Sequence, residues 1–186
     1  METTALEGIS ATDVLRKEHR NIKNLFGRFE EATSDRQKKS IGDACLRQIE
    51  VYTVLQEELF YPAVRRYVGE RLRVVQAQAA LQVAKLLIKE LKALSGGEHY
   101  NARFHLLKEN IVQLIEESEA ELLPRVEKSR MDLRQMARQM QTLKERVSRM
   151  YQRIDGRTVA AVAAGATVIG VAAFLIGQFR NSRRLA

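Results

Sequence analysis

The chain of 186 residues has few of the residues that interrupt helices or cross-link small domains. It contains two prolines, ten glycines, no tryptophan and one cysteine. With so few breakers, and no alternating β-branched runs between turns, the sequence favours long helices over strands. The single Cys45 excludes an internal disulfide, and its place on an apolar helical stripe indicates a buried side chain rather than a reactive thiol. We therefore expect an all-α protein.

The first 128 residues also lack net charge, because they hold 20 basic and 20 acidic residues. Residues 129–186 hold 11 basic and three acidic residues, and so account for the whole formal net charge of +8. A basic segment confined to one end of the chain and adjoining an apolar run indicates an anionic membrane surface as the partner, rather than nucleic acid.

Helical periodicity divides residues 11–128 into four amphipathic helices, after a flexible lead-in at residues 1–10. The predicted helices end near residues 32, 67, 94 and 127. Because short connections join them, the sequence predicts an up-and-down four-helix bundle, a fold whose sites are built from inward side chains. The third helix is expected to bury Leu72, Val75, Ala80, Ala84, Leu87 and Leu91.

A fifth helix, the basic stem at residues 129–156, has apolar residues alternately three and four positions apart. They are Leu133, Met136, Met140, Leu143, Val147, Met150 and Ile154. This heptad seam is suited either to packing back on the bundle or to pairing with a second copy, and the pattern leaves both open. Asp155-Gly156-Arg157 is expected to end the helix.

Residues 158–179 contain no charged residue, and as a helix they would be roughly 33 Å long, enough to cross a bilayer core. We expect a single-pass transmembrane helix followed by a short basic tail at residues 180–186. More basic residues precede this segment than follow it, which favours a bundle facing the cytoplasm. Small residues at four-residue spacing would allow self-association in the membrane. Residues 129–186 resemble small bacterial tail-anchored helical proteins, which implies the inner membrane.

Four stretches together resemble the hemerythrin-like (HHE cation-binding) family, over about residues 10–150. They are residues 13–19 (DVLRKEH), 57–64 (EELFYPAV), 98–104 (EHYNARF) and 119–124 (EAELLP). The resemblance implies a four-helix bundle with two non-haem irons between the helices. In that family the first and third helices each supply a histidine, and the second and fourth each supply a His-x-x-x-Glu pair, which suits iron chemically.

Placed on this sequence with Pro62 and Pro124 as reference points, the family's ligand pattern keeps only His19. The other five ligand positions hold Tyr52, Gln56, Leu81, Leu114 and Ser118. Leucine offers no donor, and glutamine lacks the charge that would offset two cations in a core. We therefore expect no metal site and no di-iron cofactor. His19 would be a remnant ligand in a buried polar cluster that is hydrogen-bonded internally.

These patterns predict a membrane-anchored hemerythrin-like protein that has lost di-iron binding. It would not be an enzyme, because the sequence has no nucleophile–base pair, phosphate loop or cofactor motif. Its expected role is that of a scaffold, adaptor or regulatory module, with the bilayer, an unidentified protein and a second copy as partners. One alternative is a genuine iron- or O₂-binding sensor. Another is a binder of anionic membranes or nucleic acid through the stem, although the stem's basic residues lack aromatic stacking partners.

Overall fold

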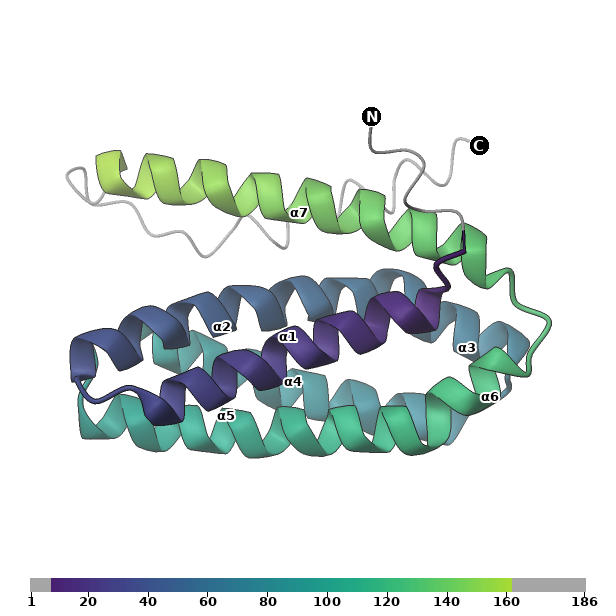
Figure 1. Cartoon of the computed structure of the whole chain (residues 1–186), viewed down its shortest axis with the longest axis horizontal. Helices are drawn as coiled ribbons and strands as arrows, with labels where there is room; N and C mark the ends of the chain where they lie inside the picture. The colour runs from purple at the N-terminus through teal and green to yellow at the C-terminus, as the bar shows by residue number, and fades with distance from the viewer. Residues whose placement is uncertain (1–7, 162–186) are drawn as a thin grey trace. The chain divides into compact units, whose positions relative to one another are not determined.

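The computed structural model describes residues 8–161, and the side chains of residues 8–151. The chain divides into two units at residues 148 and 149, so each unit is described by itself. Every regular element within residues 8–161 is helical, which confirms the all-α prediction (Figure 1). The elements are α1 (Ala11–Glu31), α2 (Asp35–Leu55), η2 (Gln56–Phe60), α3 (Tyr61–Tyr67), α4 (Arg71–Ala93), α5 (Glu98–Glu117), η3 (Ser118–Leu122), α6 (Leu123–Glu127) and α7 (Leu133–Ala161).

The first helix begins where its sequence provides a complete N-terminal cap. The Ser10 hydroxyl accepts a hydrogen bond from the Asp13 amide at 3.1 Å, and the Asp13 carboxylate accepts one from the Ser10 amide at 3.0 Å. Two otherwise unpaired amides are satisfied in this reciprocal arrangement. The hydrogen bonds from Ser10 also hold the pKa of Asp13 below its ordinary value, so this carboxylate keeps its charge to a lower pH than a free aspartate does.

Two π-helical turns, η2 and η3, join α2 to α3 and α5 to α6 into two continuous rods. In η2 the Tyr61 amide bonds to the Gln56 carbonyl, five residues back. In η3 the Leu123 amide bonds to the Ser118 carbonyl in the same way. A proline, Pro62 or Pro124, is the second residue after each π-turn, and it has no amide hydrogen and would crowd an α-helical carbonyl. The wider turn accommodates both prolines without breaking the rods.

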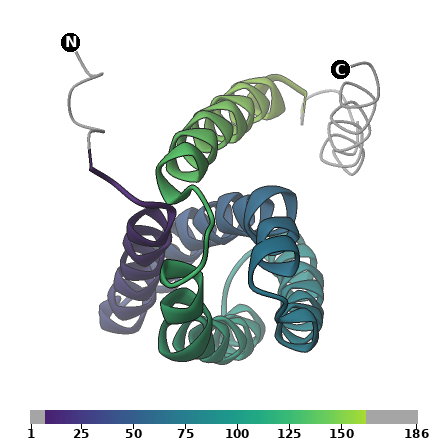
Figure 2. The same cartoon turned by 90° about the vertical axis from the view of Figure 1, so that its right-hand side faces the viewer.

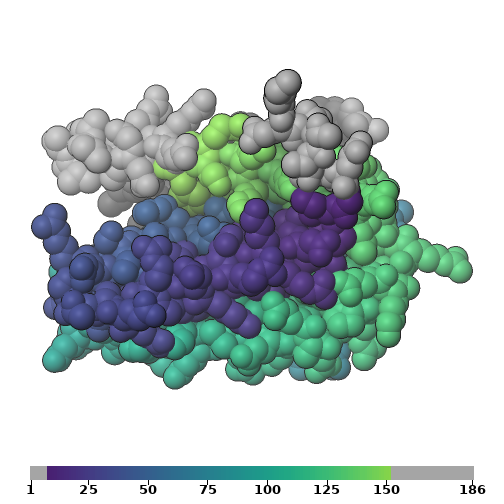
Figure 3. Space-filling model, viewed as in Figure 1, coloured from purple at the N-terminus to yellow at the C-terminus, as the bar shows by residue number. Residues whose placement is uncertain are grey.

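These rods pack with α1 and α4 into a helical bundle. α1 packs on α2 and α5, and α4 packs on α5 and α2, so α1 and α4 are diagonal to each other (Figures 1 and 2). One end of the core is aromatic: the rings of Phe29 and Phe104 stack with centroids 3.9 Å apart, and Tyr100 stacks on Phe104. The space-filling view shows α1 and the α5 rod side by side on one face (Figure 3).

The predicted inward face of α4 is correct at Ala84 and Leu91, which are buried, and wrong at the start of the helix. Leu72 and Val75 are 71% and 55% exposed, whereas the buried residues are Val74, Leu81, Ala84, Ile88 and Leu91. α4 is apolar on nearly all sides, so periodicity alone does not select a face. Packing against α2 and α5 selects it, and leaves a second apolar stripe facing outward.

Over residues 133–148, the heptad seam packs within its own chain. Met136, Met140, Leu143 and Val147 are buried. Beside them Lys144 forms an ion pair with Glu18 of α1. The described part of the seam is therefore packed intramolecularly in this single chain, and pairing with a second copy stays a prediction. The predicted end of the helix at Asp155-Gly156-Arg157 is wrong, because α7 continues to Ala161.

No helix within residues 8–161 is long and apolar enough to cross a membrane. Of the predicted transmembrane segment at residues 158–179, all but the first four residues lie outside the described part of the chain. The basic tail and most of the predicted lead-in also lie outside it.

Candidate functional site: a buried polar cluster in the bundle

All six positions at which the family resemblance places metal ligands lie in the bundle core. His19 comes from α1, Tyr52 from α2, Gln56 from η2, Leu81 from α4, Leu114 from α5 and Ser118 from η3, and none is more than 7% exposed. Gln56 and Ser118 open the two π-turns, so the same local distortion directs both side chains. Their interpretation as replaced ligands stays a prediction.

The His19 ring is fully buried, and both of its nitrogens have hydrogen-bond partners. Nδ1 lies 2.8 Å from a carboxylate oxygen of Glu119 in η3, and Nε2 lies 3.2 Å from the Tyr52 hydroxyl. The partners assign the tautomer, because only a donor at Nδ1 suits a carboxylate. The neutral ring therefore donates to Glu119 and accepts from Tyr52, and links α1 to α2 and to η3.

Burial determines the charge states in this cluster. Desolvation lowers the pKa of His19 below 6.5, while the Glu119 hydrogen bond opposes that shift without cancelling it. Desolvation also raises the pKa of the Tyr52 hydroxyl well above its ordinary value, although the neighbouring Gln56 carboxamide lowers it somewhat. At neutral pH the buried members are thus an uncharged imidazole and an uncharged phenol, and the only carboxylate, Glu119, is about one-third exposed.

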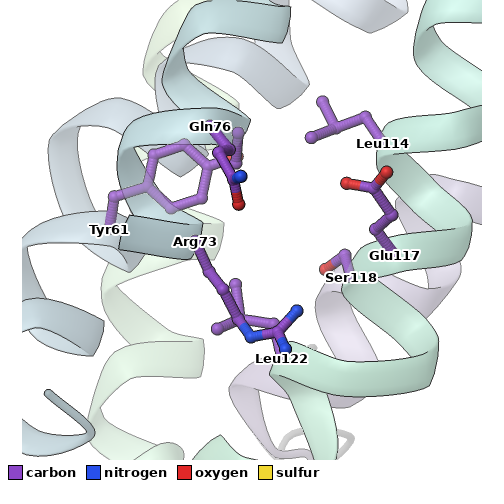
Figure 4. Close-up of a pocket in the computed structure, with 8 residues that line it drawn as sticks. Tyr61, Arg73, Gln76, Leu114, Glu117, Ser118 and Leu122 are labelled. Atoms are coloured by element: carbon purple, nitrogen blue, oxygen red, sulfur yellow. The ribbon is translucent and has the colours of Figure 1, made fainter. Parts of the chain in front are cut away.

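Two members of the predicted cluster are not hydrogen-bonded within the part of the chain that the structure describes. Neither polar side-chain atom of Gln56 has a partner at hydrogen-bonding geometry, and neither has the Ser118 hydroxyl. Ser118 faces a cavity of about 30 Å³ between α4 and η3, together with Arg73, Gln76 and Glu117 (Figure 4). That volume accommodates one or two water molecules, which would satisfy the hydroxyl. The prediction of a cluster satisfied from within is therefore correct for His19 and Tyr52 only.

Glu119 is the cluster member that the sequence did not reveal, because it belongs to the acidic run of Glu116, Glu117, Glu119 and Glu121, a pattern typical of a solvated helix face. The π-turn brings it over His19, and Lys23 approaches its other oxygen at 3.7 Å. A buried histidine in need of an acceptor was the only available signal. His99 lies in the first turn of α5 rather than in the preceding loop, and both it and His105 are exposed, away from the cluster.

A buried carboxylate, that of Glu18, lies next to His19 in the chain. Glu18 is 1% exposed, and it accepts hydrogen bonds from Gln48 of α2 and Lys144 of α7. The two adjacent residues of α1 therefore connect to three other elements, α2, η3 and α7. Because each of these contacts joins segments far apart in sequence, the cluster is suited to fixing how the helices are arranged.

The donor set does not fit a di-iron centre. Of the six ligand positions, two hold leucine, and the remaining imidazole uses both nitrogens in hydrogen bonds to protein groups. Within the described residues, no three of the histidine, cysteine, aspartate and glutamate side chains gather closely enough to hold a metal ion. Two divalent cations would also lack bridging carboxylates at Gln56 and Ser118.

The chain matches no protein-family model, no curated protein and no solved structure.

Proposed function

We propose that this chain is a membrane-anchored, non-enzymatic protein of hemerythrin-like architecture, whose bundle serves as a scaffold, adaptor or regulatory module. One observation carries the proposal. At the depth where the resemblance would place two irons, the side chains bond to one another instead, through the Glu119–His19–Tyr52 chain. A site reorganised in this way contributes stability and helix arrangement in place of metal chemistry.

The connectivity of the cluster supports a scaffold role. Glu119, His19 and Tyr52 join three elements, and Glu18 joins α7 to α1 and α2. The stem helix is thereby attached to the bundle at a buried charge. A bundle fixed at the start of its stem would present its surface to partners in a defined orientation relative to residues 133–148.

The metal content of the purified chain tests the loss of iron. The full chain is produced in iron-supplemented cells, and its iron is measured by elemental analysis together with oxo-bridge ultraviolet absorption. We expect no stoichiometric iron. About two irons per chain, the family's complement, would contradict the proposal and favour the iron- or O₂-sensing alternative.

A restored variant is the matched positive control. It carries Tyr52→His, Gln56→Glu, Leu81→His, Leu114→His and Ser118→Glu, which rebuild the family's ligand pattern around His19. Because all five positions are buried in the core, we expect this variant to acquire iron that the natural chain does not hold. If the restored variant folds, by circular dichroism, and still takes up no iron, the alignment of ligand positions is wrong.

The membrane attachment is tested separately in cells. The full chain is expected to remain with membranes during alkaline carbonate extraction, and a chain lacking residues 158–186 is expected to be released. Release of the full chain would refute the anchor and would leave the interpretation of the buried cluster unaffected.

A further inference from the structure

The outward face of α4 carries an apolar stripe that no part of the bundle covers. It consists of Leu72, Val75, Ala79, Val83 and Leu86, and is here called the α4 outer stripe. Its large members are 46–71% exposed and, within the described residues, make up four of the six large hydrophobic side chains that are exposed. The steps of three and four residues align them along one line of the helix, opposite the buried face. Such an exposed apolar line marks an interaction surface.

Leu106 extends this apolar surface from the neighbouring helix. It is 47% exposed on α5, one turn after Arg103. Arg103 bonds to Glu90 of α4 at 3.2 Å, so this side of α5 borders the outward face of α4. The apolar surface is therefore wider than a single line of side chains.

Two cations border the α4 outer stripe. Arg71 and Lys89 are 18 residues apart, which is five full helical turns, so they lie along the same flank. Both are exposed, and neither makes an ion pair within the described residues. The other basic residues of α4 are paired with glutamates: Arg73 with Glu70 and Glu121, Lys85 with Glu57, and Lys92 with Glu50.

The charge of α4 stands out from that of the bundle. α4 has five basic residues and one acidic residue, Glu90, and the acidic residue is already paired. The first 128 residues as a whole are neutral, so acidic residues outside α4 balance the basic charge of this helix. An apolar stripe with an unpaired basic flank is the pattern of helices that lie in the plane of an anionic membrane.

A second copy of the chain fits this surface less well. The stripe is symmetric about Ala79, so an antiparallel copy would align Leu72 with Leu86 and Val75 with Val83. The same two-fold axis, however, would bring Arg71 close to Lys89 of the second copy along the shared edge. Two like-charged contacts at the rim oppose that pairing, whereas anionic lipid headgroups would match both cations.

We infer that the α4 outer stripe docks the bundle onto an anionic lipid bilayer. Leu72, Val75, Val83 and Leu86 enter the boundary between headgroups and acyl chains, while Arg71 and Lys89 contact anionic headgroups. This docking goes beyond the proposed anchor at residues 158–179, and it specifies which face of the bundle lies against the membrane.

A fluorescent reporter in the full chain tests the docking. Val83→Cys is labelled with an environment-sensitive dye, and the chain is reconstituted in vesicles of phosphatidylcholine with or without phosphatidylglycerol. Cys45 does not compete for the label, because it is fully buried and burial raises its pKa to about 12. Asn24→Cys is the matched control, since it is exposed on α1, diagonal to α4.

We expect brominated lipids to quench the label at position 83 in vesicles that contain phosphatidylglycerol, and to leave the label at position 24 unquenched. Replacing Arg71 and Lys89 by glutamine should lower the ratio of docked to undocked chains by roughly five-fold for each cation removed. Leu72→Ser with Leu86→Ser should abolish the quenching. Because both positions are exposed, these variants should keep the wild-type helix content.

Two outcomes would overturn the inference. One is equal quenching, or none, at positions 83 and 24 in the anionic vesicles. The other is a label at position 83 that is shielded from water in detergent as much as in vesicles, together with a doubled molecular mass in light scattering. A second copy of the chain would then cover the stripe. Flotation of the unlabelled chain after carbonate treatment reports the anchor independently, so loss of docking and loss of anchoring are distinguished.

Discussion

Nδ1 of His19 lies 2.8 Å from a carboxylate oxygen of Glu119, and this contact joins the first helix to a π-turn one hundred residues later. The ring is fully buried, whereas Glu119 is about one-third exposed. The carboxylate can therefore be hydrated on one side while it holds the imidazole on the other. The second ring nitrogen meets the Tyr52 hydroxyl, which is fully buried and therefore out of contact with bulk solvent.

Removing the imidazole alone is expected to destabilise the bundle through Tyr52. His19→Leu fills the space with an apolar side chain but leaves a buried hydroxyl unpaired, at a cost of about 1–3 kcal/mol in unfolding free energy. The double variant His19→Leu with Tyr52→Phe should recover most of that loss, because no polar group is then left without a partner. Urea unfolding of the two single variants and the double variant measures the coupling. Additive losses would show that the hydrogen bond has no structural role.

The same histidine should make stability depend on pH. Burial holds the pKa of His19 below 6.5, and Lys23 and Arg16 add to that shift, whereas Glu119 opposes it. As pH falls below about 6.5 the unfolded chain takes up a proton that the folded chain resists, so the free energy of unfolding should decrease. The comparison is made by urea unfolding at about pH 7.5 and about pH 5.5.

Carboxylates elsewhere in the chain also respond to this change of pH, so a variant without the histidine is needed as the reference. The double variant His19→Leu with Tyr52→Phe should lose less stability between the two pH values than the natural chain loses. An identical loss in both proteins would mean that His19 does not titrate differently in the folded and unfolded states.

The sequence predicted the depth of the candidate site better than its hydrogen bonds. The family resemblance, with Pro62 and Pro124 as reference points, placed His19, Tyr52, Gln56, Leu114 and Ser118 in the core, and all of them are buried. Which of these groups bond to one another depends on sub-ångström placement across different helices. A one-dimensional pattern does not contain that information, and so Glu119 was missed and Gln56 was wrongly expected to be satisfied.

A helix face follows from the sequence where apolar and polar residues separate clearly, as on α1, whose buried residues include Ile22, Phe26 and Phe29. At the start of α4 the predicted face is wrong, because Leu72 and Val74 both offer apolar surface and only tertiary packing chooses between them. The π-turns were also missed. Pro62 and Pro124 indicated an interruption, but a helix can end, kink or widen before a proline, and its neighbours decide which occurs.

Two helical glycines should respond in opposite ways to alanine. A Cβ on Gly27 would meet nothing within 4 Å, so Gly27→Ala should raise the unfolding free energy by about 0.5–1 kcal/mol through the helix propensity of alanine. A Cβ on Gly42 would overlap the hydroxyl of Tyr100. That ring is buried and stacked on Phe104, so it has little room to move.

Gly42→Ala should therefore lower the unfolding free energy by about 1–3 kcal/mol despite the better propensity. Thermal unfolding of the two variants beside the natural chain decides the matter. A Gly42→Ala variant as stable as Gly27→Ala would mean that Tyr100 is not held against α2.

The ion pair between Lys144 and Glu18 should couple the stem helix to the stability of the bundle. Glu18 is 1% exposed, and without Lys144 its remaining partner is Gln48. Lys144→Met should therefore cost about 1–3 kcal/mol in unfolding free energy, because a buried carboxylate loses its cation. Adding Glu18→Gln should return part of that loss by removing the buried charge.

Arg134→Met is the matched control, since Arg134 is exposed on the same helix and its replacement should be neutral within about 0.5 kcal/mol. If Lys144→Met is as neutral as Arg134→Met, the seam does not pack on the bundle in solution, and pairing with a second copy becomes the better account of its heptads.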